Sequence, residues 1–261
     1  MATDGEGYEL TMGRWSRRLA QPFLDFIGPG CTGRVLDVGC GTGHLAGAIA
    51  SRSASAQVQA VDLSPVYVAA AKRQYANEQV QFEVGDACAL TFPDRAFDCV
   101  LSMLLLHFVP DTARALAQMR RVARTGATVG AAVWDVRGGF VANRMFFDTA
   151  AALDAKAGER RARNYTRPMT RPGELAAAWK SVGFIDVAET LISIRMEFGS
   201  FADYWAPYIG KEGPAAEYVG SLSSDERERL AAAVRAAYLD GEPDGPRSYG
   251  ASAWAVRGVV A

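Results

Sequence analysis

The sequence predicts an α/β fold in which a mostly parallel sheet carries helices on both faces. Three observations support this prediction. Strand patterns alternate with helix patterns through the first half of the 261-residue chain, as in repeated strand–helix units. The stretch 97–103 is mostly apolar, as expected for a parallel strand covered on both sides. The stretch 35–50 joins a strand to a helix through a turn with three alternate glycines, which suits the close approach of a ligand.

Regular elements are expected to begin after residues 1–10, which carry no clear pattern. Apolar residues recur at helical spacing over 12–27, and Gly28-Pro29-Gly30 ends that helix. A later helix begins with Ser64 as its N-cap and Pro65 at its first position. The expected strands of this half cover 34–38, 57–61, 79–84, 97–103 and 127–134, and the core helices between them cover 43–51, 64–75 and 110–124.

The alternation ends after Trp134. Helices are expected near 141–157, 173–182, 200–209 and 224–239, with strands near 185–196 and 249–260. We predict a single domain, because no repeat, linker or low-complexity tract divides the chain. Its expected parts are a leading helix in 1–30, a ligand-binding core over 31–137, helical cap insertions over 138–182 and 199–247, and closing strands over 183–198 and 248–261.

Composition and charge argue against several classes of function. The net charge of −1 gives no basic field for nucleic acid or anionic lipid, and no apolar run is long enough to span a membrane. The acidic start at residues 1–6 is unlike a secretory signal. Four cysteines without C-x-x-C spacing, beside only two histidines, predict no metal site and favour a reducing cytoplasm. The oligomeric state is left open.

Two classes of ligand compete for the glycine turn. The run Gly41-Thr42-Gly43-His44-Leu45-Ala46 matches the dinucleotide pattern G-x-G-x-x-A, and Asp62 follows at about the expected distance. In the register that starts at the strand, however, Asp37 stands before the glycines. A carboxylate there would repel a pyrophosphate and would attract an ammonium or sulfonium group. S-adenosylmethionine carries both of these cationic groups.

At these residues the chain resembles the class I S-adenosylmethionine-dependent methyltransferases, in particular those that act on small molecules. The resemblance covers roughly residues 12–135 and implies a Rossmann-like, mostly parallel seven-stranded sheet with the last strand antiparallel. The turn 121–126 departs from the Pro-Gly-Gly that the family often has before strand five. The similar segments are the glycine motif 37–43, the ribose-binding acid in 62–64, the adenine-binding turn 85–87, and the fourth-strand region at 97–100 and 106–108.

The resemblance implies S-adenosylmethionine as the cofactor. Asp62 would accept hydrogen bonds from both ribose hydroxyls, and Asp86 would accept one from the adenine amino group. Leu63 and Met103 would hold the adenine between them, and Arg18 would pair with the cofactor carboxylate. Each role has an alternative. Asp62 can be a surface acid and Asp86 an ordinary turn residue, Leu63 and Met103 can be core residues, and Arg18 can be a solvated arginine. The predicted cofactor-binding residues are Arg18, Asp37, Gly39, Cys40, Gly41, Asp62, Leu63, Asp86, Ala87 and Met103.

Catalysis needs few groups, because in-line methyl transfer from a sulfonium depends mainly on proximity and alignment. His107 is the one candidate base by position, although packing in its loop explains it equally well. Tyr165, Trp205 and Tyr208 of the cap can line an acceptor pocket or form the cap's own core. The basic run 160–167 fits a solvated surface better than a site for an acidic acceptor.

We therefore expect an S-adenosylmethionine-dependent methyltransferase that acts on a small molecule, without nucleic-acid or membrane partners. Two alternatives remain: a non-enzymatic protein that binds S-adenosylmethionine, and a nicotinamide-dependent oxidoreductase. Asp37 and the lack of a suitable Tyr-x-x-x-Lys pair argue against the oxidoreductase. The sequence fixes neither the acceptor nor the atom that is methylated.

Overall fold

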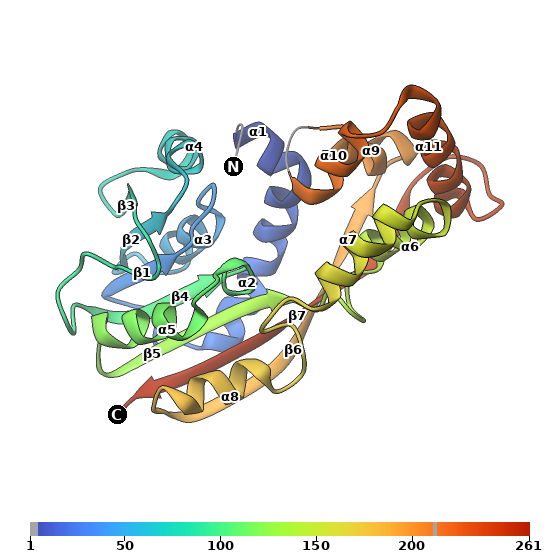
Figure 1. The fold of residues 1–261 in the computed structure, drawn as a ribbon. Helices are drawn as coiled ribbons and strands as arrows, with labels where there is room; N and C mark the ends of the chain where they lie inside the picture. The colour runs from blue at the N-terminus through green and yellow to red at the C-terminus, as the bar shows by residue number, and fades with distance from the viewer. Residues whose placement is uncertain (1–4, 211–212) are drawn as a thin grey trace.

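The computed structural model describes residues 5–210 and 213–261, in which seven strands form one sheet (Figure 1). The spatial order of the strands is β3-β2-β1-β4-β5-β7-β6. β7 runs antiparallel to β5 and β6, whereas the other neighbouring pairs are parallel. The predicted Rossmann-like sheet with an antiparallel last strand is therefore confirmed. The strands are β1 (Arg34–Val38), β2 (Gln57–Asp62), β3 (Val80–Val84), β4 (Phe97–Met103), β5 (Ala123–Trp134), β6 (Phe184–Phe198) and β7 (Arg247–Val260).

Two layers of helices cover the sheet and enclose separate apolar cores. One core receives buried side chains from α2, α3 and α4, and the other receives them from α5 and α8. Ser64 caps α4 through its side-chain oxygen, as predicted, and Asp111 caps α5 in the same way. These helices are α2 (Arg14–Ile27), α3 (His44–Arg52), α4 (Pro65–Tyr75), α5 (Thr112–Val122) and α8 (Glu174–Ser181).

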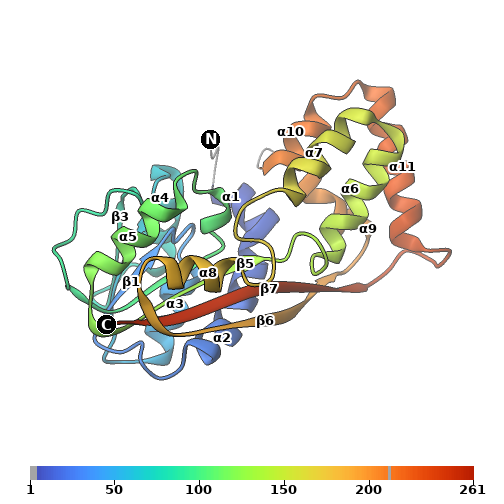
Figure 2. The ribbon, with the colours of Figure 1, turned by 60° about the horizontal axis from the view of Figure 1, so that its bottom comes forward.

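α8 lies within the range predicted as cap, yet it packs on the sheet. The side chain of Trp179 is fully buried, and its indole N–H donates to the backbone carbonyl of Val129 at 3.0 Å. The helix contacts β6 and β7 rather than the other cap helices (Figure 2). The cap prediction was wrong for 173–182, because amphipathic spacing does not distinguish a cap helix from one that covers a sheet.

The segment before α2 is helical, although residues 1–10 were expected to be irregular. It comprises α1 (Gly5–Tyr8) and the π-helix η1 (Glu9–Gly13), and residues 1–4 lie outside the described part. The segment is held by contacts with residues distant in sequence, which a local sequence pattern does not reveal. The Glu9 carboxylate accepts hydrogen bonds from the Thr42 hydroxyl at 2.5 Å and from His44 Nε2 at 2.7 Å. The N-terminal segment is thereby fixed to the glycine turn.

The cap stands at one end of the sheet, where the two longest strands extend beyond β5 (Figures 1 and 2). The predicted helix at 141–157 is divided at Asp154, whose carboxylate caps the second piece by accepting from the Lys156 N–H at 3.0 Å. The cap elements are α6 (Val141–Leu153), α7 (Ala155–Tyr165), α9 (Phe201–Trp205), the 3-10 helix η3 (Ala206–Ile209), α10 (Gly213–Gly220) and α11 (Ser224–Leu239).

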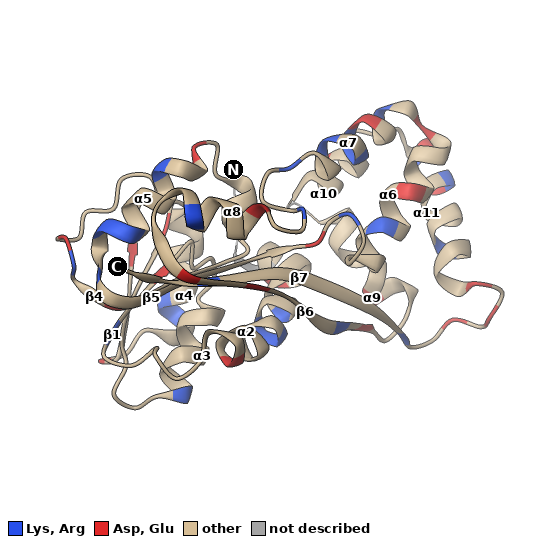
Figure 3. Cartoon of the chain, turned by 90° about the horizontal axis from the view of Figure 1, so that it is seen from below, with Lys and Arg blue, Asp and Glu red and all other residues tan. Residues whose placement is uncertain are grey.

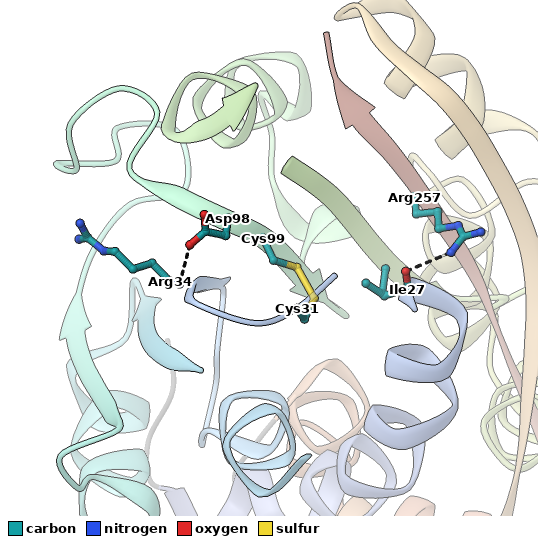
Figure 4. Close-up of a disulfide and its surroundings, with 6 residues drawn as sticks. All are labelled: Ile27, Cys31, Arg34, Asp98, Cys99 and Arg257. Atoms are coloured by element: carbon teal, nitrogen blue, oxygen red, sulfur yellow. Dashed lines mark hydrogen bonds between the residues drawn. A yellow bond between two sulfur atoms is a disulfide. The ribbon is translucent and has the colours of Figure 1, made fainter. Parts of the chain in front are cut away.

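A disulfide joins Cys31, in the loop after α2, to Cys99 of β4 (Figure 4). Nearby, the backbone N–H of Arg34 donates to the Asp98 carboxylate at 2.8 Å. The predicted reducing cytoplasm did not anticipate this bond, because disulfides are typical of oxidising compartments. The two cysteines lie 68 residues apart and show no pairing pattern in the sequence. The compartment therefore stays a prediction.

Charged residues of both signs are interspersed over the sheet layer and the cap, and α7 carries several basic residues (Figure 3). Within residues 5–210 and 213–261, no helix combines the length and apolar character needed to cross a membrane. In the same ranges, no group of three or more His, Cys, Asp and Glu side chains is placed to hold a metal ion.

Candidate active site

A cavity of about 460 Å³ lies between the carboxyl ends of the central strands and the cap. Gly39 after β1, Asp62 at the end of β2 and Met103 at the end of β4 line its sheet side. Residues of α6, η3 and α10 line its cap side. Parallel strands end at a common edge, and open α/β sheets bind ligands there. One cavity thus joins the predicted cofactor site to the cap.

The glycine turn requires its glycines. Gly39 and Gly41 have φ angles of 77° and 53°, in the left-handed region that other residues rarely adopt. A Cβ atom on Gly39 would lie 2.6 Å from the Leu105 side chain, and one on Gly41 would lie 3.0 Å from the Tyr8 hydroxyl. The turn therefore presents bare backbone to the cavity, as the sequence motif predicts.

Asp62 lies at the edge of this turn and lines the cavity. Its carboxylate accepts backbone hydrogen bonds from Gly41 and Ser64, both at 2.9 Å. Burial raises the pKa of this carboxyl above its ordinary value. Each carboxylate oxygen keeps a lone pair for a further donor, so Asp62 is held in place and can still accept from two hydroxyls of a ligand.

Asp37 is completely buried, and neither of its carboxylate oxygens has a hydrogen-bond partner among the described residues. It borders a small cavity of about 10 Å³ that shares Tyr8, Gly39 and Met103 with the large one. Burial, together with the smaller effect of the Asp62 charge, raises the pKa of Asp37 to about 7, and the backbone of Ala46 partly offsets this rise. A space of this size admits one water molecule or one ammonium group.

Tyr8 and Glu9 belong to this site but were missed by the sequence analysis. The Tyr8 ring lies 4.8 Å from the Tyr67 ring, centroid to centroid, and both residues line the cavity. Glu9 anchors the segment through Thr42 and His44. No motif marks them, because a polar, acidic chain start lacks helical periodicity. The N-terminal segment therefore covers the cofactor end of the cavity.

Several predicted cofactor residues lie outside the described lining of the large cavity. Arg18 instead forms an ion pair with Glu197 at 2.6 Å and donates to a backbone carbonyl of β6, so its predicted carboxylate contact is not supported. Leu63 is 72% exposed. The Asp86 carboxylate accepts from a backbone N–H of its own turn, and Ala87 packs toward the second apolar core. Gly39, Gly41, Asp62 and Met103 line the large cavity, whereas Asp37 and Cys40 line only the small one.

His107 lines the cavity and is 6% exposed, and its Nδ1 has no hydrogen-bond partner among the described residues. Burial lowers its pKa to about 3, and the positive charge of Arg167 contributes to this shift. A neutral imidazole with so low a pKa accepts a hydrogen bond but does not retain an abstracted proton at neutral pH. The structure therefore favours a positioning role over general-base catalysis.

The cap side of the cavity is largely aromatic. Tyr208 lines it and stacks on Phe146 with ring centroids 4.0 Å apart. Tyr204 lines it as well, and its hydroxyl donates to the Ala142 carbonyl at 2.8 Å. These side chains belong both to the core of the cap and to the wall of the cavity. Tyr208 therefore packs in the cap core and lines the cavity, the two roles between which the sequence left a choice. Tyr165 and Trp205 do not line the described cavity.

Residues 36–130 match the family model of a methyltransferase domain. A demethylmenaquinone methyltransferase from Roseiflexus castenholzii is 31% identical over 175 residues, which cover 64% of this chain and 73% of that protein. The chain belongs to the class I S-adenosylmethionine-dependent methyltransferase family. The predicted family and its cofactor are thereby confirmed.

Two further comparisons place this methyltransferase chain among its relatives. An uncharacterized protein of Mycobacterium tuberculosis is 34% identical over 116 residues, and the match spans 44% of this chain but only 41% of that relative. A crystal structure of phosphoethanolamine N-methyltransferase 2 from Haemonchus contortus, in complex with S-adenosyl-L-methionine, is 19% identical. It superposes with a TM-score of 0.59 over 98% of this chain and 57% of that chain, which shows a shared fold.

Proposed function

We propose that this protein transfers a methyl group from S-adenosylmethionine to a small-molecule acceptor held beneath the cap. The observation that carries the proposal is the buried, unpartnered carboxylate of Asp37 beside the glycine turn. An unpaired buried carboxylate is costly in an apolar interior. A ligand ammonium group in the adjoining space would remove that cost, and a dinucleotide pyrophosphate would increase it.

The residues at the sheet edge fit the cofactor. Asp37 would hold its ammonium group, and Asp62 would accept from its ribose hydroxyls while its own position is fixed by two backbone N–H groups. When bound, S-adenosylmethionine supplies a methyl carbon on a positively charged sulfur: the acceptor's lone pair forms the new bond, and the electron pair of the broken sulfur–carbon bond stays on sulfur. Tyr8 would exclude water by covering Gly41.

The acceptor end supports a small molecule. The cavity is enclosed by aromatic side chains of the cap and the sheet edge, a lining typical of sites for small organic ligands. The name of the Roseiflexus relative refers to demethylmenaquinone, which is also a small molecule. His107 would position the acceptor by accepting a hydrogen bond, and a proton released by the acceptor would pass to solvent.

The first test is calorimetric binding of S-adenosylmethionine, S-adenosylhomocysteine and NAD to the wild-type protein. We expect the first two to bind and NAD not to bind. Turnover is then measured as S-adenosylhomocysteine formed against a library of small-molecule acceptors. Binding of NAD without S-adenosylhomocysteine would contradict the family-based proposal. Binding of S-adenosylhomocysteine with no turnover across the library would favour the non-enzymatic alternative.

A further inference from the structure

The four arginines of the basic run 160–167 have different surroundings, although the sequence analysis treated them as one surface. Arg160 lies 3.9 Å from the Glu217 carboxylate, and Arg161 lies 3.2 Å from the Asp148 carboxylate. Arg163 is exposed to solvent. Arg167 alone turns inward and lines the large cavity. The expectation of a solvated surface therefore fails for one arginine of the four.

Arg167 has no anionic partner within the described residues. Its guanidinium carbon lies 4.4 Å from the centroid of the Phe108 ring, which holds the planar group in place. The side chain is partly buried, and this burial lowers its pKa. Its charge reaches His107, whose pKa it helps to lower. A cation that is partly desolvated and has no counter-charge keeps its guanidinium donors available for an anionic ligand.

The surroundings of Arg167 define the kind of ligand. Among the described lining residues it is the one lysine or arginine, so the cap side offers a single positive charge. Asn143 and Asn164 also line the cavity, and their side chains form no hydrogen bond within the described residues. The rest of the lining is mostly apolar and aromatic, including Trp134 and Phe140, and His107 adds a neutral polar group. One charge, two amides and aromatic walls suit a flat apolar molecule with one anionic group.

We propose that the methyl acceptor carries a carboxylate, that Arg167 binds this carboxylate, and that the acceptor's apolar body lies against the aromatic wall of the cap. A guanidinium matches the planar geometry of a carboxylate through two parallel hydrogen bonds. A phosphate, which bears closer to two charges at neutral pH, would leave charge unmatched by a single arginine. The proposal rests on the proposed function and adds the acceptor class to it.

The cofactor's own carboxylate is a competing partner, but the geometry argues against it. In an amino acid the ammonium and carboxylate groups share one carbon, so a carboxylate whose ammonium group lies at Asp37 must lie beside the small cavity. That cavity is bordered by Ser16, His44 and Leu45 from α2 and α3, and Arg167 is not part of its described lining. Arg167 instead contacts Phe108, beyond the end of β4.

The test uses matched pairs of neutral and anionic probes with the S-adenosylhomocysteine complex. The pairs are benzoate and benzamide, 2-naphthoate and 2-naphthamide, and indole-3-acetate and indole-3-acetamide, each titrated by calorimetry. Wild type should bind at least one carboxylate roughly tenfold or more tightly than its amide, as expected for a charge-assisted hydrogen bond. Arg167→Met should lose this preference and Arg167→Lys should keep part of it. Arg163→Met, which changes an exposed arginine of the same run, should keep all of it.

Three results would overturn the proposal. They are no carboxylate preference in wild type for any pair, a preference that survives in Arg167→Met, and a tenfold loss of S-adenosylhomocysteine affinity in that variant. The last result would assign Arg167 to the cofactor. Failure of the proposed function is distinct, because wild type would then either not bind S-adenosylhomocysteine or bind it without turnover of any acceptor in the library.

Discussion

The two ends of the cavity are built in different ways. The cofactor end is acidic, and its two carboxylates, Asp37 and Asp62, come from adjacent parallel strands. The cap end is aromatic and carries one cation, Arg167, from the turn after α7. The cofactor end depends on backbone conformation and buried charge, whereas the cap end depends on packing between elements far apart in sequence. Cofactor binding and acceptor choice should therefore respond to different substitutions.

The largest expected effect concerns the pH dependence of stability at the cofactor end. The pKa of Asp37 is raised to about 7 in the folded protein, so between about pH 4 and 7 the folded state binds more protons than the unfolded state. Stability from this group is therefore present at low pH and is lost as pH rises through that window, by up to about 4 kcal/mol. Asp37→Asn should abolish the loss. The free energy of unfolding is measured by urea titration without ligand at pH 5 and pH 8, for wild type and for Asp37→Asn. An equal change with pH in the two proteins would contradict the prediction.

Asp62→Asn should weaken cofactor binding by roughly 2–4 kcal/mol, because the variant replaces one accepting oxygen by a donor and removes the charge. The hydrogen bonds to Gly41 and Ser64 tie this residue to the turn, so the melting temperature is measured alongside affinity. Asp225→Asn is the matched control, since Asp225 is exposed and outside the described cavity lining. An equal loss of cofactor affinity in the two variants would show that Asp62 has no special role in binding.

Tyr204→Phe tests whether the cap end is independent of the cofactor end. The variant removes the hydroxyl that donates to the Ala142 carbonyl and accepts from the Tyr208 hydroxyl. The buried Tyr208 hydroxyl is then left without its acceptor, at a cost of about 1–3 kcal/mol in stability. S-adenosylhomocysteine affinity should stay within twofold of wild type. A parallel loss of cofactor affinity would show that the two ends are coupled.

The smallest expected effect is at the N-terminal segment. Glu9→Gln replaces charge-assisted hydrogen bonds to Thr42 and His44 by neutral ones, and should speed cofactor release several-fold, in line with about 1 kcal/mol. Stopped-flow displacement of S-adenosylhomocysteine measures the rate. Arg17→Gln is a control on the same side, since Arg17 lies farther from Glu9, at 3.8 Å. Unchanged release in Glu9→Gln would mean that the segment does not retain the cofactor.

The comparison also explains what the sequence could predict. The segment 37–43 and Asp62 were predictable because strand ends and glycine turns are local, and parallel pairing brings them to one edge. The ion pair of Arg18 could not be predicted, because helical spacing does not specify its partner, Glu197, which lies on β6. Arg167 resembled a surface residue because its neighbours in sequence are basic and solvated, while its inward orientation arises from the fold of the cap.

The central claim is that Asp37 holds the ammonium group of the cofactor. The most direct test removes the amino group from the ligand and the charge from Asp37, separately and together. S-adenosylhomocysteine and its analogue with hydrogen in place of the α-amino group are titrated into wild type and Asp37→Asn by calorimetry at pH 8. We predict that wild type loses roughly 10- to 100-fold in affinity when the amino group is removed, and that Asp37→Asn binds both ligands about equally. Equal binding of both ligands by wild type, or full discrimination by Asp37→Asn, would show that the buried carboxylate does not hold the cofactor's ammonium group.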